Sequence, residues 1–347
     1  MISGYATYKD TVNYLDRNRI VNSETEWFSF SPIAIGTHLG NMDETDSRLY
    51  QTSIEYGLKN GINYIDTAIN YRGMRSERDL GVVLSRLINE KKLIKRSEIV
   101  ISSKAGLIPG DIDAKLIPTE YLQKILLEGG IIKQSDLNIV EHHRHVLVPS
   151  YYEFAIEKSK MHLGLDTIDI YYIHNPEISL KVVGPEVFYE KLKMLFISFE
   201  EQVSKGNIQY YGLATWSGLL CNPSEAGYIS LEKVVNVLKE AIGDDHHFKF
   251  IQCPYNSYMD EAKTRKNQEV NRESYSVLEA AQKLGLTVVT SAPFNLGKLI
   301  HEGENPYKIL LSILHDPFIH SVMVGMKNVE HVIKNMELIR KSSSPIE

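Results

Sequence analysis

Short apolar runs alternate with longer amphipathic segments along nearly the whole chain. Runs of four to six mainly β-branched and aliphatic residues between polar or turn residues are typical of buried strands. Eight such runs lie at residues 33–36, 62–65, 99–103, 168–173, 208–213, 250–253, 286–290 and 322–325. Between them, apolar residues recur at helical spacing, as along residues 188–203 and 231–238. Because strands that alternate with helices pair in parallel, and eight of them close a barrel, we predict an α/β fold, a (β/α)8 TIM barrel.

The spacing between predicted strands is uneven at one place. Residues 105–150 separate the third strand from a helix expected near Tyr151, and they include a helical piece at 121–127 and a polar run at 141–145. Loops at the carboxyl ends of barrel strands build active sites, so we expect an inserted lid or substrate wall. A surface decoration or a subunit contact fits the pattern nearly as well.

The two ends of the chain carry little of this pattern. Residues 1–31 are mixed and polar, which predicts a small hairpin or an irregular lead-in, and residues 342–347 form a polar tail. Because no linker or internal repeat interrupts the alternation, we predict a single domain over residues 1–347.

Composition and charge exclude several classes of protein. A net charge of −6 disfavours nucleic-acid binding through phosphate contacts, which needs a basic surface. We also expect no membrane association, because no apolar run approaches the roughly 18 residues of a membrane span. The polar N-terminus and only two cysteines, Cys221 and Cys253, favour a cytoplasmic protein with reduced thiols.

Polar residues close or follow every predicted strand. In a barrel these positions meet on one rim, which is where this fold keeps its chemistry. They are Thr37, Asp66, Lys104, His174, Thr215, Gln252, Ser291 and Lys327. Tyr71 lies in the loop after the second strand, ahead of a helix for which we expect Ser76 to be the N-cap.

Asp66, Tyr71, Lys104 and His174 together predict a proton-transfer site. A phenol has a pKa of about 10 and is a poor acid at neutral pH, but a nearby ammonium group lowers that pKa. Asp66 would keep Lys104 charged, Tyr71 would donate a proton to a carbonyl oxygen, and His174 would orient the substrate. Because no side chain supplies a hydride, such a site needs a cofactor.

The loops after the seventh and eighth predicted strands are the expected phosphate site. The chain has neither a G-x-G-x-x-G after its first strand nor a P-loop, whereas barrels commonly bind phosphate at these two loops. They span residues 291–299 and 325–328, and the second leads into a helix that Asn328 would cap, with Lys327 beside it. Glycine, proline and asparagine also occur in ordinary turns, so a purely structural interpretation stays open.

Six groups of residues, in order from Gly36 to Asn335, resemble the motifs of the aldo-keto reductases. They are Asp66-Thr67-Ala68 with Tyr71, Gly73 and Ser76-Glu77; Ser103-Lys104; residues 168–174; residues 212–216; Gln252 with residues 254–256; and residues 324–326. The stretch 165–177 is similar to a poorly characterised prokaryotic branch.

This resemblance implies NAD(P)H-dependent reduction of an aldehyde or ketone, or the reverse oxidation of an alcohol such as a sugar, with Asp66, Tyr71, Lys104 and His174 as the catalytic tetrad. The residues expected to bind the cofactor are Thr37, Thr215, Gln252, Ser291, Phe294, Leu296, Gly297, Gly325, Lys327, His331 and Asn335. His38 and Trp216 are the expected substrate walls, together with parts of the insertion.

The chain departs from the family pattern around the cofactor. Ala214-Thr215 replaces the usual Ser-Asn that holds the nicotinamide carboxamide, and Ser291 replaces the aromatic residue that stacks on the ring. The Lys and Arg that usually bind the adenosine 2′-phosphate in this family align with Gly325 and His331. Lys327 and His331 would therefore have to bind this phosphate instead. We therefore favour NADP, with NAD as the alternative.

Two other functions fit the same residues. One is a cofactor-binding regulatory subunit with little turnover, and the other is a lyase that forms a Schiff base at Lys104, which would need that lysine neutral. Histidine-containing stretches at 141–145 and 246–247 could bind a metal, but such residues in polar loops are usually solvated, so we predict no metal site. The pattern does not identify the physiological substrate or the oligomeric state.

Overall fold

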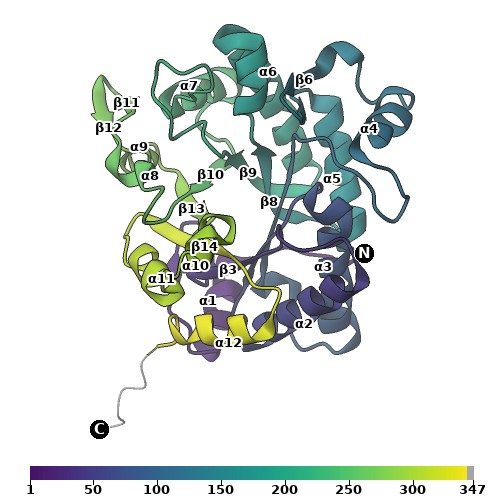
Figure 1. The fold of residues 1–347 in the computed structure, drawn as a ribbon, viewed down its shortest axis with the longest axis vertical. Coiled ribbons are helices and arrows are strands. Elements are labelled where there is room, and N and C mark those ends of the chain that lie inside the picture. The colour runs from purple at the N-terminus through teal and green to yellow at the C-terminus, as the bar shows by residue number, and fades with distance from the viewer. Residues whose placement is uncertain (342–347) are drawn as a thin grey trace.

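The computed structural model describes residues 1–341, and the polar tail predicted at 342–347 lies outside the described residues. Eight parallel strands form a closed barrel in the order β3, β4, β5, β8, β9, β10, β13 and β14 (Figure 1). The predicted (β/α)8 barrel is therefore confirmed. The strands are β3 (Ile33–Gly36), β4 (Tyr64–Asp66), β5 (Val100–Ala105), β8 (Ile168–His174), β9 (Ile208–Ala214), β10 (Phe248–Pro254), β13 (Thr287–Ser291) and β14 (Ile319–Gly325).

Helices surround the barrel, as expected when each crossover between parallel strands contains a helix. The main helices are α2 (Glu44–Asn60), α3 (Arg75–Leu84), α5 (Pro149–Leu163), α6 (Glu177–Ser204), α7 (Leu231–Ile242), α9 (Val277–Lys283), α11 (Pro306–Leu314) and α12 (Val329–Glu337). Shorter pieces are η1 (Tyr71–Met74), η2 (Ser85–Glu90), η3 (Arg96–Glu98), α8 (Glu261–Thr264), η6 (Asn295–Gly297) and α10 (Lys298–His301). A two-stranded hairpin of β11 (Gln268–Val270) and β12 (Glu273–Tyr275) lies between α8 and α9.

The N-terminal segment is more regular than predicted. It forms helix α1 (Tyr8–Arg17), which the sequence interpretation missed, and then a hairpin of β1 (Ser23–Glu24) and β2 (Ser29–Phe30). Phe30 stacks on Tyr64 at the start of β4, with ring centroids 4.8 Å apart, and Phe28 stacks on Phe250. The hairpin therefore covers the amino-terminal end of the barrel and leaves the carboxyl end as the open mouth.

The insertion between β5 and β8 folds into a helical piece and a hairpin. The helical piece is α4 (Pro118–Tyr121), continued by η4 (Leu122–Leu127), and η5 (Gln134–Asp136) leads to β6 (Leu137–Val140) and β7 (His143–Val146). Strand β6 packs beside α6 (Figure 1). This packing brings the turn of the β6–β7 hairpin, which contains the predicted polar run, to the mouth of the barrel.

Two local predictions have opposite outcomes. Asn328 caps α12, because its side chain accepts a hydrogen bond from the backbone N–H of Glu330. Ser76, by contrast, lies inside α3 and donates a 2.7 Å hydrogen bond to the carbonyl of Thr37, so its predicted capping role is wrong. The helix starts two residues earlier than expected, with Met74 in place of Ser76 at the N-cap position, because the preceding residues adopt left-handed backbone angles and place Arg75 in its first turn.

Both cysteines are free thiols. Among the described residues, every helix is too short or too polar to cross a membrane.

Candidate active site

Asp66, Lys104 and Tyr71 form a connected group at the mouth of the barrel. Lys104 Nζ, on β5, lies 2.6 Å from Asp66 Oδ2 at the end of β4 and 3.4 Å from the Tyr71 hydroxyl. It also donates to the carbonyl of Thr67 at 2.8 Å. The lysine and the aspartate are almost completely buried. The structure thus brings three of the four predicted catalytic residues into direct contact.

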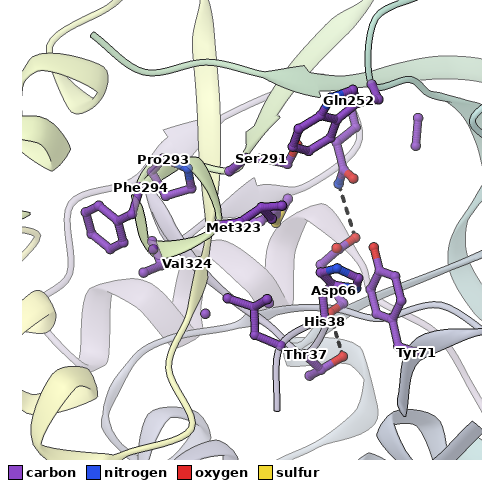
Figure 2. A pocket seen from close by; sticks show the side chains of 18 of the residues that line it. Thr37, His38, Asp66, Tyr71, Gln252, Ser291, Pro293, Phe294, Met323 and Val324 are labelled. Carbon is purple, nitrogen blue, oxygen red and sulfur yellow. Dashed lines mark hydrogen bonds between the residues drawn. The ribbon is translucent and has the colours of Figure 1, made fainter. Parts of the chain in front are cut away.

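The second oxygen of Asp66 is held from two other strands. Ser102 on β5 donates to Asp66 Oδ1 at 2.7 Å, and Gln252 on β10 donates to the same oxygen at 3.2 Å. Figure 2 shows Gln252 reaching Asp66 across the cavity, with Tyr71 beside the carboxylate. A carboxylate fixed on both oxygens cannot rotate away from Lys104, so the ammonium group is held in place.

The charge of Lys104 depends on this carboxylate. Burial alone would lower the pKa of Lys104, because a low-dielectric site disfavours the charged form, but Asp66 and Tyr71 reverse the effect and raise that pKa above its ordinary value. Lys104 is therefore an ammonium group at neutral pH.

The pKa of Tyr71 differs from the sequence-based expectation. Burial raises the pKa of this phenol, and the attraction of the Lys104 ammonium group counteracts the rise only in part. We had expected the lysine to bring the pKa below the ordinary value. The expectation is wrong for the protein without a bound ligand, because desolvation of the phenolate outweighs one positive neighbour 3.4 Å away. Tyr71 is consequently protonated at neutral pH and able to donate.

His174 closes β8 beside Tyr71, with the two ring centroids 5.8 Å apart. Burial, followed by the positive charge of Lys104, lowers the pKa of His174 well below its ordinary value, so the imidazole is neutral. Its Nδ1 is buried and has no hydrogen-bond partner among the described residues. Its backbone carbonyl accepts a 2.7 Å hydrogen bond from Nε2 of His145, a residue of the insertion.

These side chains open into one cavity of about 960 Å³. The cavity is lined by almost every residue that the sequence interpretation assigned to the site, several of which are labelled in Figure 2. Those residues are Thr37, His38, Asp66, Tyr71, His174, Thr215, Trp216, Gln252, Ser291, Phe294, Leu296, Gly297, Gly325, His331 and Asn335. The insertion contributes Leu107, Val140, Glu141 and His143 to the wall. Lys104 lies beneath the floor, fully buried behind Asp66 and Tyr71.

Lys327 is the one assigned cofactor residue that the structure keeps out of the cavity. Its ammonium group lies 2.8 Å from Asp46 Oδ2 on α2, because the loop after β14 turns back against that helix. Lys334 lines the cavity instead, on α12 together with His331 and Asn335. The sequence could have indicated this position of Lys334, since Lys334 and His331 are three residues apart and share one face of the helix.

The end of the cavity near Asp66 carries polar atoms that the protein itself leaves without partners. Thr215 Oγ1 is buried and makes no hydrogen bond to any described residue. Thr215 directly follows β9 and lies near Gln252 of β10, so a hydroxyl group and an amide lie beside the group formed by Asp66, Lys104 and Tyr71.

The sequence profile of the aldo/keto reductase family matches residues 32–310. The chain belongs to the aldo/keto reductase family. The match confirms the family that the motifs indicated and, with it, the class of NAD(P)-dependent oxidoreductases. No curated protein matches the chain.

Solved aldo-keto reductases share its fold. One from Bacillus halodurans, in its holo form, is 19% identical, with a TM-score of 0.59 over 93% of this chain and 92% of that chain. Another from Klebsiella pneumoniae, in complex with NADP and acetate, is 16% identical, with a TM-score of 0.57 over 94% of this chain and 92% of that chain.

Sequence reasoning missed a buried carboxylate in this aldo/keto reductase. Glu177, at the start of α6, lines the cavity and accepts backbone hydrogen bonds from Trp216 at 2.7 Å and from Ser217 at 3.0 Å. Burial raises the pKa of Glu177, although those amides counteract it. Glu177 thereby fixes the loop that carries Thr215 and Trp216. A lone glutamate three residues after His174 gave no signal of this contact.

The histidine-containing stretches differ in their surroundings. Glu141, His142 and His143 have potential ligand atoms within 4.8 Å of one another at the turn of the β6–β7 hairpin, where Glu141 and His142 are exposed. His145 is instead buried, between the carbonyl of His174 and the hydroxyl of Ser179. His247 pairs with Glu200 at 2.8 Å. The absence of a metal site stays a prediction.

Proposed function

We propose that this aldo/keto reductase reduces an aldehyde or ketone to an alcohol with NADPH, or catalyses the reverse oxidation. The observation that carries the proposal is the Lys104 ammonium group, 2.6 Å from Asp66 and 3.4 Å from a protonated Tyr71, at the floor of a large cavity. This arrangement is a positioned proton donor with a charge beside it that stabilises the donor after the proton has left.

The residues present fit a nicotinamide dinucleotide. The unpartnered hydroxyl group of Thr215 and the amide of Gln252 would hold the nicotinamide end, beside the catalytic group. His331, Lys334 and Asn335 on α12 would hold the adenosine end, where Lys334 and His331 favour the extra phosphate of NADP. That Klebsiella pneumoniae relative was solved with NADP, which supports the same choice here.

A bound nicotinamide supplies the hydride for the carbonyl carbon. The chain supplies the proton, because Tyr71 Oη donates to the carbonyl oxygen as negative charge develops on it. The Lys104 ammonium group then stabilises the tyrosinate, and Asp66 keeps that ammonium group charged and in position. Neutral His174 orients the substrate oxygen, and His38 and Trp216 bound the space around it.

The direct test of the proposal is Tyr71→Phe. We expect turnover of a panel of aldehydes and sugars to fall by about 100-fold or more, since a positioned general acid contributes roughly 10²–10⁴-fold. Binding of NADPH, followed by its fluorescence, should be unchanged because the ring remains. Near-normal reduction by the variant would contradict the assignment of Tyr71.

The two alternative functions give different results in the same assay. A regulatory subunit would bind NADPH tightly yet reduce none of the panel. A lyase that uses Lys104 as a nucleophile is disfavoured by the raised pKa of that lysine, since only a neutral amine attacks a carbonyl group.

A further inference from the structure

We propose that Arg72 is a positioning residue for the catalytic tyrosine, an inference that rests on the function proposed above. Arg72 directly follows Tyr71 in the loop after β4. Its guanidinium group fixes this loop to three neighbouring segments and thereby sets the place of the phenol relative to Lys104.

The first argument is the conformation of the loop. Arg72, Gly73 and Met74 all have positive φ angles, of 50°, 59° and 69°. Residues other than glycine rarely adopt this left-handed region, so two of these three residues hold an unfavourable backbone. Such a conformation persists only where surrounding contacts impose it.

The second argument is the completeness of the contacts that Arg72 makes. Although it is charged, its side chain is only 1% exposed. Nη1 lies 2.7 Å from Asp79 Oδ2 on α3, and Nη2 donates to the Ser47 hydroxyl group on α2 at 3.1 Å. Nε donates to the carbonyl of Asn41 at 2.8 Å, and the guanidinium group lies 4.9 Å from the ring centroid of Tyr50.

The segments held by Arg72 are those that border the catalytic group. Asn41 belongs to the loop after β3, which carries His38, and its N–H donates to Asp46 at 2.6 Å. Asp46 in turn pairs with Lys327 in the loop after β14, which directly follows the cavity residue Gly325. A single network thus joins the loops after β3, β4 and β14. It also gives Lys327 a role outside the cavity.

The third argument is that Tyr71 has few hydrogen bonds of its own. Its backbone N–H donates to the carbonyl of Ala68 at 3.0 Å, and its hydroxyl group has Lys104 as its hydrogen-bond partner within the described chain, at 3.4 Å. Its ring also packs against those of His38 and His174, with ring centroids 4.7 and 5.8 Å away. Apart from these packing contacts, the place of the phenol follows from its own backbone, and the next residue along that backbone is Arg72.

The decisive variant is Arg72→Gly. Glycine adopts positive φ angles freely, so this substitution removes the guanidinium contacts while easing the backbone. We expect kcat for carbonyl reduction to fall by about 10- to 100-fold, since a displacement of about 1 Å at a catalytic group has effects of this size. The affinity for NADPH should stay the same, and Arg72→Lys, which keeps a charge opposite Asp79, should recover part of kcat.

The matched control is Arg75→Lys, three residues further along the same segment. Arg75 forms ion pairs with Glu44 and Asp113, both at 3.0 Å, but its partners are exposed. This variant should keep kcat. Hydrogen exchange of the amides at residues 70–76 gives a readout independent of activity, and it should accelerate in Arg72→Gly but not in Arg75→Lys.

The proposal would be overturned if Arg72→Gly kept kcat within about twofold of the parent value and left hydrogen exchange unchanged. A displacement of the Tyr71 phenol large enough to affect catalysis would lower kcat by much more than about twofold. If Arg72→Gly does not fold, the variants Arg72→Lys and Ser47→Ala test the proposal in the same two assays. Full activity and unchanged hydrogen exchange in both of these variants would also overturn the proposal. If the parent protein reduces no carbonyl compound, the proposed function fails, and the exchange experiment still decides whether Arg72 holds the loop.

Discussion

The protonation state of Lys104 decides whether this residue can support proton transfer or act as a nucleophile. A lysine buried without a partner would tend to lose its proton and become a nucleophile, whereas one that is paired stays an ammonium group. Here Asp66 lies 2.6 Å away and is itself fixed by Ser102 and Gln252. The carboxylate therefore favours the proton transfer proposed above over Schiff-base chemistry.

Asp66→Asn should expose this choice. With the carboxylate gone, burial remains and should bring the pKa of Lys104 below its ordinary value, the reverse of its direction in the parent protein. We expect reductive trapping of a small aldehyde on Lys104 at neutral pH in the variant and none in the parent, measured by mass spectrometry of the peptide.

Ser102→Ala is the matched control for this prediction. It removes a 2.7 Å hydrogen bond to the same carboxylate without changing its charge, so Lys104 should stay unreactive. Equal labelling of the parent and Asp66→Asn would refute the role of the carboxylate. Strong labelling of the parent would favour the lyase.

At the scale of elements, the β6–β7 hairpin supports the catalytic strand β8 through one buried histidine. His145 Nε2 lies 2.7 Å from the carbonyl of His174, and His145 Nδ1 lies 2.7 Å from the Ser179 hydroxyl group on α6. Gly106 makes the approach possible, since a Cβ at this position, with φ of +145°, would lie 2.5 Å from both His145 Nε2 and the His174 carbonyl.

His145 should make the stability of the protein depend on pH. Burial lowers its pKa from 6.5 to about 4, so the unfolded chain binds a proton first as the pH falls. Its contribution to stability is complete above pH 6.5 and declines towards pH 4. Between pH 6.5 and pH 5 we expect this one residue to lower the free energy of unfolding by about 2 kcal/mol.

Urea denaturation of His145→Gln at both pH values checks this expectation. Glutamine does not titrate, so the variant should lose about 2 kcal/mol less than the parent over the same interval. His142→Gln is the control, because His142 is an exposed residue of the same hairpin. A parent and a His145→Gln protein with the same pH dependence would contradict the buried neutral state of His145.

The elements differ in how well the sequence predicts them. All eight barrel strands were predicted, because strands buried on both faces appear as nearly continuous apolar runs. Helix α1 was missed, because only Thr11, Tyr14 and Leu15 of it are buried and so few residues give a weak periodic pattern. The insertion was located by spacing, but its β6–β7 hairpin was not predicted.

The residues of the candidate site also differ in how well the sequence predicts them. The sequence identified residues at strand ends, since the barrel itself brings them together. It did not identify Arg72 or Glu177, whose roles depend on partners 7 to 40 residues away that only the folded loops bring near. It also placed Lys327 among the cofactor residues, whereas this side chain pairs with Asp46 and lies outside the cavity lining.

At the scale of the whole molecule, the cavity reaches from the catalytic group to the face of α12. The two ends have different chemistry, since one is lined by Asp66 and Tyr71 and the other by His331 and Lys334 on α12, and His301 also belongs to the lining. NADPH and NADH differ only by a phosphate on the adenosine ribose, so a preference between them must arise at the second end.

Lys334→Gln should therefore weaken binding of NADPH by about tenfold, or roughly 1.4 kcal/mol, and leave binding of NADH unchanged. The substitution removes a positive charge that makes no ion pair with any described residue. Thermal unfolding with each nucleotide measures both effects, because a ligand that binds only the folded protein stabilises it in proportion to the logarithm of its concentration over Kd.

Lys308→Gln on α11 is the control, since Lys308 is exposed outside the cavity lining and its loss should leave both shifts in unfolding temperature as they are. If Lys334→Gln weakened NADPH and NADH equally, Lys334 would contact a part common to both nucleotides, and the preference for NADPH would have to be sought at His331 or His301.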